Sequence, residues 1–204
     1  MLSGYAAAAY YTDDTRYSGM NLVSLIVDTA ELNNKALANF DILGQGILLV
    51  DANSFSGSRQ GWAVGGFVSS GKMTAQEGKA ELSLNITGVS IEKSFPQGLF
   101  TLITGAKAGV GKAYLHFLLG SDVQSWEDAR QGGRENIVSS SFWFIEPYAG
   151  ARMQITDFLA LEAKLGLGMS MSDGQWKQRN TKVGYANYSV GGFSVIIGVT
   201  AGIY

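Results

Sequence analysis

The sequence of 204 residues contains no cysteine, only two prolines and a single histidine. Without cysteine the chain can form neither a disulfide, nor a thiolate metal site, nor a cysteine nucleophile. Charged residues make up 16% of the chain, against roughly 25% in an ordinary soluble domain. The 15 basic residues are balanced by 17 acidic ones, so no basic excess is offered to a phosphate backbone. Nucleic acid is therefore not an expected partner.

Long hydrophobic runs are also missing. The longest apolar stretches, such as Leu22 to Val27 and Val195 to Val199, fall far short of the ~18 residues that a transmembrane helix needs. Met1 is followed by LSGYAAAAYYTDD, which has neither the basic start nor the leucine-rich centre of a signal peptide. These absences exclude a helical membrane protein. They do not exclude a membrane barrel, whose strands need only about 10 alternating residues each.

The most regular feature of the sequence is alternation with a period of two. From Leu159 to Ser172 every odd position is apolar, and the even positions are small, charged or hydroxylic. The run from Phe142 to Ile155 alternates in the same way, and only Thr156, Asp157 and Phe158 separate the two runs. This pattern predicts two strands joined by a tight hairpin. In that register Arg152 lies opposite Glu162, which predicts an ion pair on the polar face.

Similar segments predict about eight strands in all. The other six run over Tyr5 to Tyr11, Phe40 to Val50, Trp62 to Ser69, Leu82 to Ile91, Phe100 to Val110 and Phe193 to Ile203. A change of phase at Gly88 predicts a β-bulge, and Pro147 predicts a bulge or a local break. Residues 20–34 have apolar side chains at helical spacing, which predicts a short helix in the first long connection.

Short and long connections tend to alternate along the chain, as they do in an up-and-down meander. The fold class that follows is all-β, an antiparallel up-and-down β-barrel of about eight strands in a single domain over residues 1–204. Neither a linker nor a high-identity repeat interrupts it.

The sequence resembles the small bacterial outer-membrane β-barrels. The resemblance is strongest in the C-terminal third, in IEPYAGARMQITDFLALEAKLGLGMS and in the terminal GFSVIIGVTAGIY, which ends on an aromatic residue as such barrels do. It implies a bacterial outer-membrane or cell-envelope location, apolar residues that face lipid and a polar interior. On that basis the expected interior charges are Glu81, Lys107, Glu146, Arg152, Glu162 and Lys164.

Two functions remain open on the sequence alone. The first is a non-enzymatic envelope barrel with a structural or surface-interaction role, whose partner is the lipid bilayer. The second is a soluble β-barrel or sandwich that binds a small apolar ligand, or self-associates as a homo-oligomer through its apolar surface. The orientation of Leu161, Leu165, Leu167 and Val195 separates them, since these side chains face outward in the first and inward in the second.

Catalytic and metal chemistry have little support in the sequence. His116 precedes Ser121 and Asp122, but there is no nucleophile motif around that serine. We therefore expect no enzyme activity, no cofactor and no metal site. The aromatic side chains of the long polar loops have two alternative roles: they recognise a partner or a sugar, or they cap the barrel end or pack against the helix, which is the favoured alternative. The candidates for recognition are Trp126, Trp176 and Tyr185.

Overall fold

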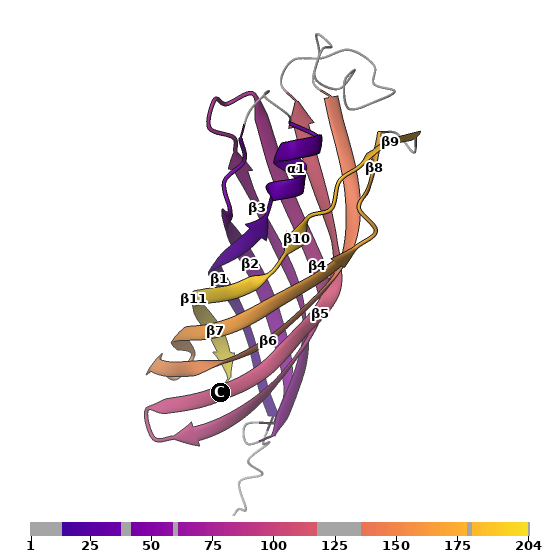
Figure 1. Ribbon diagram of the computed structural model, residues 1–204. Coiled ribbons are helices and arrows are strands. Elements are labelled where there is room, and N and C mark those ends of the chain that lie inside the picture. The colour runs from indigo at the N-terminus through magenta and orange to yellow at the C-terminus, as the bar shows by residue number, and fades with distance from the viewer. Residues whose placement is uncertain (1–13, 38–41, 59–60, 118–135, 179–180, 204) are drawn as a thin grey trace, which may run out of the picture.

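A computed structural model describes residues 14–37, 42–58, 61–117, 136–178 and 181–203. Eight long strands form a barrel, with a short helix and three short strands at one end (Figure 1). The long strands are β1 (Asp14–Asp28), β2 (Gly46–Ser58), β3 (Trp62–Thr74), β4 (Ala80–Gln97), β5 (Phe100–Phe117), β6 (Asn136–Thr156), β7 (Leu159–Ser172) and β11 (Gly192–Ile203). The other elements are α1 (Ala30–Lys35), β8 (Gln175–Gln178), β9 (Thr181–Tyr185) and β10 (Ser189–Val190).

The long strands follow one another around the barrel, and all their pairings are antiparallel. β1 pairs with β11, and β5 pairs with β6, so the sheet closes into a ring. This arrangement confirms the predicted up-and-down barrel. α1, β8 and β9 lie at the end that we call the upper end, and the β4–β5 and β6–β7 turns lie at the lower end (Figure 1). In the described part of the chain, no helix has the length and apolar character needed to cross a membrane.

The β6–β7 hairpin has the predicted register. Arg152 pairs with Glu162, and the two strands are joined through Asp157 and Phe158. The hydroxyl of Thr156 accepts hydrogen bonds from the backbone N–H groups of Phe158 and Leu159 at 3.4 and 3.1 Å, which fixes the turn.

The strand pairing at Pro147 is irregular on one side only. Pro147 pairs in register with Ala106 of β5, and the β6–β7 register is the same on both sides of the proline. The register shift lies between Gln154 and Thr156, next to the turn. Of the two predicted alternatives at Pro147, the bulge is wrong and the local break is present, because the β6–β7 pairing is interrupted at Glu146 and Pro147, where the proline has no N–H to donate.

The barrel interior changes character along its axis. Toward the upper end it is an apolar core, to which α1 contributes Leu32 and to which β4 and β5 contribute leucines such as Leu84 and Leu115. Toward the lower end it is lined by buried polar and charged side chains. Outside the barrel the order is reversed, because polar residues lie at the upper end and large apolar residues lie below them.

Strand β4 shows this reversal most clearly. Above Gly88, Leu84 is fully buried in the interior while Asn85 is exposed outside. Below Gly88, Val89 is exposed outside and Glu92 is buried inside. The β3–β4 and β4–β5 registers run through Gly88 without a shift. The prediction of a bulge at Gly88 is therefore wrong. The apolar positions change phase because the outer face becomes apolar and the inner face becomes polar below Gly88, while the backbone geometry of the strand stays the same.

The helix predicted over residues 20–34 is also wrong in its bounds. Strand β1 continues to Asp28, and α1 begins only at Ala30. Within β1, Leu25 points into the apolar core, whereas Leu22 is 52% exposed on the outer face. Apolar side chains on both faces remove the alternation that marks a strand, and the remaining spacing resembles that of a helix. The strand predicted over Tyr5 to Tyr11 lies outside the described residues, as does the start of the one predicted from Phe40.

The two faces of β4 can be distinguished by matched substitutions. We expect Leu84→Asp to destabilise the barrel by several kcal/mol, because it places an unpaired carboxylate in an apolar core. Asn85→Asp, one residue along and on the outer face, should change the free energy of unfolding by less than about 0.5 kcal/mol. Urea unfolding of the protein in detergent micelles measures both values. Equal effects of the two substitutions would contradict the assigned faces.

Candidate functional site

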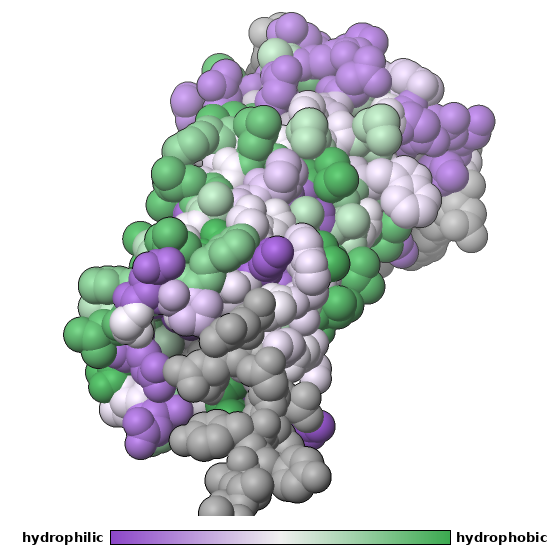
Figure 2. All heavy atoms as spheres, turned by 90° about the horizontal axis from the view of Figure 1, so that it is seen from below, coloured by the Kyte–Doolittle hydropathy of each residue, from purple (hydrophilic) through white to green (hydrophobic). Residues whose placement is uncertain are grey.

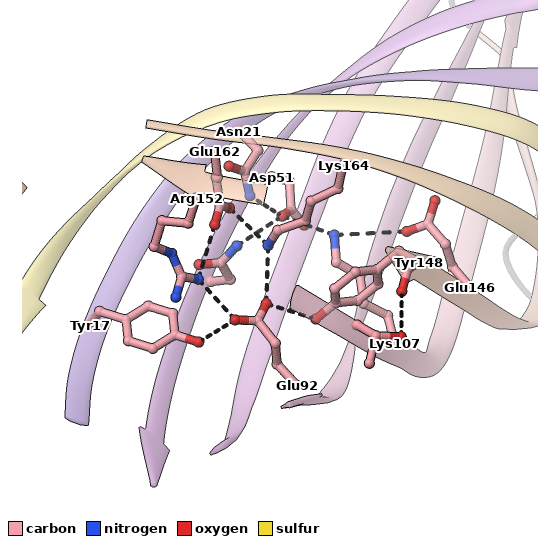
Figure 3. Close-up of polar contacts among 12 residues, drawn as sticks. Tyr17, Asn21, Asp51, Glu92, Lys107, Glu146, Tyr148, Arg152, Glu162 and Lys164 are labelled. Carbon is pink, nitrogen blue, oxygen red and sulfur yellow. Dashed lines mark hydrogen bonds and ion pairs between the residues drawn. The ribbon is translucent and has the colours of Figure 1, made fainter. Parts of the chain in front are cut away.

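The lower interior contains a cluster of charged side chains from five strands, which we call the lumen cluster (Figure 3). Strand alternation directs these residues inward, and none of them is more than 4% exposed. Its charged members are Asp51 of β2, Glu92 of β4, Lys107 of β5, Glu146 and Arg152 of β6, and Glu162 and Lys164 of β7.

Glu92 is the centre of the lower part of the cluster. One of its carboxylate oxygens, Oε1, accepts hydrogen bonds from the Tyr17 hydroxyl at 2.6 Å and from Arg152 Nη2 at 2.9 Å. The other, Oε2, accepts a hydrogen bond from the Tyr148 hydroxyl at 3.2 Å and lies 3.3 Å from Lys164 Nζ. Four donors from three other strands therefore converge on one buried carboxylate (Figure 3). Such a set offsets the cost of removing the charge from water.

The predicted contact between Arg152 and Glu162 is present. Arg152 Nη2 donates to Glu162 Oε2 at 3.1 Å, and Lys164 Nζ lies 2.9 Å from the other carboxylate oxygen of Glu162. The guanidinium of Arg152 also lies over the ring of Tyr17, 4.1 Å from its centroid. Arg152 therefore bridges Glu92 and Glu162 while an aromatic face covers it.

Lys107 joins the other two carboxylates of the cluster. Its Nζ donates to Asp51 Oδ2 at 3.0 Å and lies 3.8 Å from Glu146 Oε2. Asp51 Oδ1 also accepts from Ser69 Oγ at 2.5 Å, and Glu146 Oε1 accepts from Ser194 Oγ at 2.6 Å. Four carboxylates thus face three cations in the cluster, and neutral hydroxyl donors complete the coordination of the carboxylates.

The lumen is closed at this level. Eight strands enclose a space that side chains can fill, and here ion pairs fill it from side to side. A hollow of about 30 Å³ lies at the lower mouth and is lined by Thr15, Tyr17 and Arg152, among others. That volume accommodates about one water molecule. Above the cluster the apolar core closes the barrel a second time.

Five of the six predicted interior charges lie in the lumen cluster, and Glu81 does not. Glu81 lies at the upper end of β4 on the outer face, where it pairs with Lys72 at 3.0 Å. Including it among the interior residues was wrong, because β4 has its polar face outside at that height. Asp51 and Glu92 were missed. Asp51 shares the inner face with Leu49 and Asn53, and the alternation with the outward Val50 and Ala52 indicates this position from the sequence. The change of phase at Gly88 concealed Glu92.

The aromatic loop residues have different positions. Trp176 of β8 is fully buried in the upper core, and its indole N–H donates to the carbonyl of Ala186 at 2.9 Å. Trp176 therefore anchors the β8–β9 segment, so the packing alternative is confirmed for this residue and the recognition alternative is wrong. Tyr188 packs against it, with ring centroids 5.2 Å apart, and burial raises the pKa of this tyrosine to about 12. Tyr185 is 52% exposed, and Trp126 lies outside the described residues.

The structure does not bring together a catalytic or metal-binding group from the described residues. His116 lies on β5 and pairs in register with Glu81 and Ile137, whereas Ser121 and Asp122 lie outside the described ranges. No cluster of three or more histidine, aspartate or glutamate side chains with the arrangement of a metal site occurs in residues that the structure describes.

Comparison with known proteins gives the fold. No protein-family model and no curated protein sequence matches the chain. Among solved structures, Neisserial surface protein A (NspA) aligns with a TM-score of 0.57 and 13% identity over 91% of this chain and 96% of its own. Ail, the attachment invasion locus protein of Yersinia pestis, aligns with a TM-score of 0.54 and 12% identity over 94% and 99%. Ail in complex with the heparin analogue sucrose octasulfate gives 0.53 and 13% over the same shares. The chain has the fold of the small outer-membrane β-barrels.

The role of the lumen cluster can be tested at Glu92. We expect Glu92→Gln to destabilise the barrel by about 3–5 kcal/mol, because it removes the carboxylate that neutralises Arg152 and Lys164. The matched control is Glu81→Gln, which breaks an exposed ion pair and should cost less than about 1 kcal/mol. Urea titration in micelles, followed by tryptophan fluorescence, compares the two variants. Similar losses in the free energy of unfolding would contradict the expectation that a buried partner in the lumen cluster contributes more to stability than an exposed one.

Proposed function

We propose that the protein is a non-enzymatic outer-membrane barrel with a sealed lumen, that its upper end lies at the cell surface, and that it acts through the surface presented there. The observation that carries this proposal is the outward apolar band of the lower barrel. Leu161, Leu165, Leu167 and Val195 are all outward and 38–54% exposed, so they are not the core of a soluble barrel. Figure 2 shows such hydrophobic side chains along the wall, with hydrophilic ones most dense at one end.

The dimensions of the band fit a bilayer. On β5 the outward apolar positions run from Phe100 to Val110. Eleven residues at ~3.4 Å each, on a strand tilted by ~45°, cover about 25 Å along the membrane normal, the height of the apolar band in outer-membrane barrels. At the lower edge of the band, Lys93 Nζ lies 5.5 Å from the ring centroid of Trp62 and 5.3 Å from that of Phe95. Aromatic and cationic side chains of this kind are typical of a membrane–water interface.

The closed lumen supports a structural or surface role over transport. Ion pairs cross the barrel at one height and an apolar core fills it at another, so no aqueous path runs through the described interior. The β8–β9 segment, which the buried Trp176 anchors, instead presents Tyr185 to the outside at the upper end. We propose Tyr185 as a contact residue of that surface.

Membrane insertion predicts a specific cost for a charge in the apolar band. We expect Leu165→Arg to lower the stability of the bilayer-inserted barrel by about 2–4 kcal/mol, because the cation faces hydrocarbon. Thr74→Arg, on the outer face at the upper end of β3, should be nearly neutral. Denaturant titration in lipid vesicles measures both. The proposal fails if Leu165→Arg is harmless, or if the wild-type protein is a soluble monomer without detergent.

The orientation of the barrel can be tested because the chain has no cysteine. In intact cells that export the protein, we expect Tyr185→Cys to react with a maleimide that cannot cross the membrane. The matched control is Phe158→Cys, whose position in the lower turn is 64% exposed. It should react only after the outer membrane is permeabilised. The reverse order of labelling, or equal labelling of both, would contradict the assignment of the upper end to the cell surface.

A further inference from the structure

The outer wall of the barrel is hollowed over strands β4 to β7, in a feature that we call the outer groove. Its lower section has a volume of about 950 Å³ and an almost entirely apolar lining, and its upper section has a volume of about 590 Å³. The sections are continuous, because Thr87, Val110, Trp143 and Met171 line both.

Three cross-strand rows define the groove and locate the boundary between its sections. In the lowest row, Val89, Ala108, Ile145 and Met169 are paired side by side across the four strands. The next row toward the upper end consists of Thr87, Val110, Trp143 and Met171. One row higher, the outward residues are Asn85, Lys112 and Ser141. The wall therefore changes from apolar to polar within one row, with Trp143 at the edge of the apolar part, where an interfacial aromatic residue belongs.

The floor of the lower section is backbone and small side chains. Gly88 pairs with Gly109, and a Cβ at Gly88 would lie 2.1 Å from the carbonyl oxygen of Ala108. Gly88 and Gly109 are inner-face positions of their strands, so only their backbone borders the groove, and beside them Ala108 provides a single methyl group on the outer face. The larger side chains of Val89 and Trp143 border this floor. In a bilayer such a hollow must be filled by hydrocarbon, because a dry void would forfeit its van der Waals contacts.

The upper section, which we call the polar section, contains a cation that has no partner among the described residues. Lys112 is exposed on the outer face and, among the described residues, it has no hydrogen bond or ion pair. Tyr114, Ser141 and Asn85 line the same section and can donate hydrogen bonds. Lys72, on the same face of β3, is by contrast already paired with Glu81. Lys112 is thus available for an anion located where the apolar wall ends.

Among the described residues, Asp173 is the one carboxylate that lines the polar section. Its Oδ1 accepts the backbone N–H of Gln175 at 3.0 Å. Asp173 follows the end of β7, whereas Lys112 lies on β5 on the other side of β6. An anion is therefore favoured on the β5 side of the section and disfavoured near Asp173, which gives the two residues opposite effects on the same ligand.

We propose that the outer groove binds a lipid of the surrounding leaflet that carries a phosphate group, with an acyl chain over Ala108 and the phosphate on Lys112. This inference rests on the membrane location proposed above. The continuity of the two sections and the charge of Lys112 identify the occupant: the groove needs an acyl chain and an anion joined in one molecule.

The test uses the purified protein in a maltoside detergent, which contains no phosphate. The probes are dioleoyl phosphatidic acid and dioleoylglycerol, which have the same acyl chains and differ in the phosphate. Native mass spectrometry measures the lipid retained. We expect saturable binding of phosphatidic acid, about tenfold tighter than that of dioleoylglycerol, from one charge-assisted contact. Lys112→Gln should abolish this preference and Asp173→Asn should increase it. Inorganic phosphate alone should not displace the lipid, because it lacks the chain.

Two matched controls complete the test. Lys72→Gln removes a neighbouring exposed lysine and should leave the preference unchanged. Ala108→Trp fills the groove and should weaken binding of both lipids, whereas Ala106→Trp, two residues lower on the same outer face, should not. The proposal is overturned if the wild type binds both lipids equally, if Lys72→Gln acts like Lys112→Gln, or if Asp173→Asn weakens binding. Denaturant titration of the same variants, reconstituted in lipid vesicles, distinguishes failure of the lipid site from failure of the membrane location. Failure to insert refutes the membrane location, whereas an inserted barrel without lipid preference refutes only this site.

Discussion

The lower half of the barrel depends on the neutralisation of charges that have no access to bulk water. Glu92 shows how strict this requirement is, because its two oxygens face donors from β1, β6 and β7. A ring of eight strands leaves too little space for a water column, so a lumen charge must be neutralised by another side chain. Removing one partner leaves its counterpart buried and unpaired, so the cluster is coupled as a unit. That coupling ties all the strands that contribute to it to one register.

A second constraint follows from the surroundings of the wall. The same strands pass an apolar core and polar outer residues near the upper end, and polar contents and an apolar exterior below. Neither half needs a different backbone, since β4 passes Gly88 with an unbroken register. What changes is which face is apolar. The upper half is built like a soluble barrel, and the lower half is the inverse that suits hydrocarbon outside. The lumen is closed in both halves, because each half places in its interior the class of side chain that its outer surroundings do not accept. These are apolar side chains in the upper half and charged ones in the lower half.

These two constraints explain how far the sequence could predict the structure. The β6–β7 hairpin and the Arg152–Glu162 contact could be predicted because both strands keep one pattern over the part that forms the turn. The errors lie where the pattern changes for reasons outside the strand. In β1, Leu22 and Leu25 are apolar on opposite faces, so period two disappears and a helix was predicted. In β4, the exterior becomes polar at Glu81, which was therefore assigned to the interior. A local pattern reports the difference between two faces, and it cannot report which of them is inside.

The proposed lipid site lies on the outer wall, over strands whose inner face is tightly packed. An eight-stranded ring curves strongly, and its small inner positions allow aromatic side chains to fit across it: a Cβ at Gly111 would lie 2.1 Å from the ring of Phe142. On the outer face the small residue at this height is Ala108, and beside the inner-face glycines Gly88 and Gly109 the wall is hollow. Lipid must fill that hollow in a membrane. Lys112 lies one row above the edge of the hollow and has no partner among the described residues, so it gives a lipid that carries a phosphate an advantage over a lipid with the same acyl chains and no phosphate.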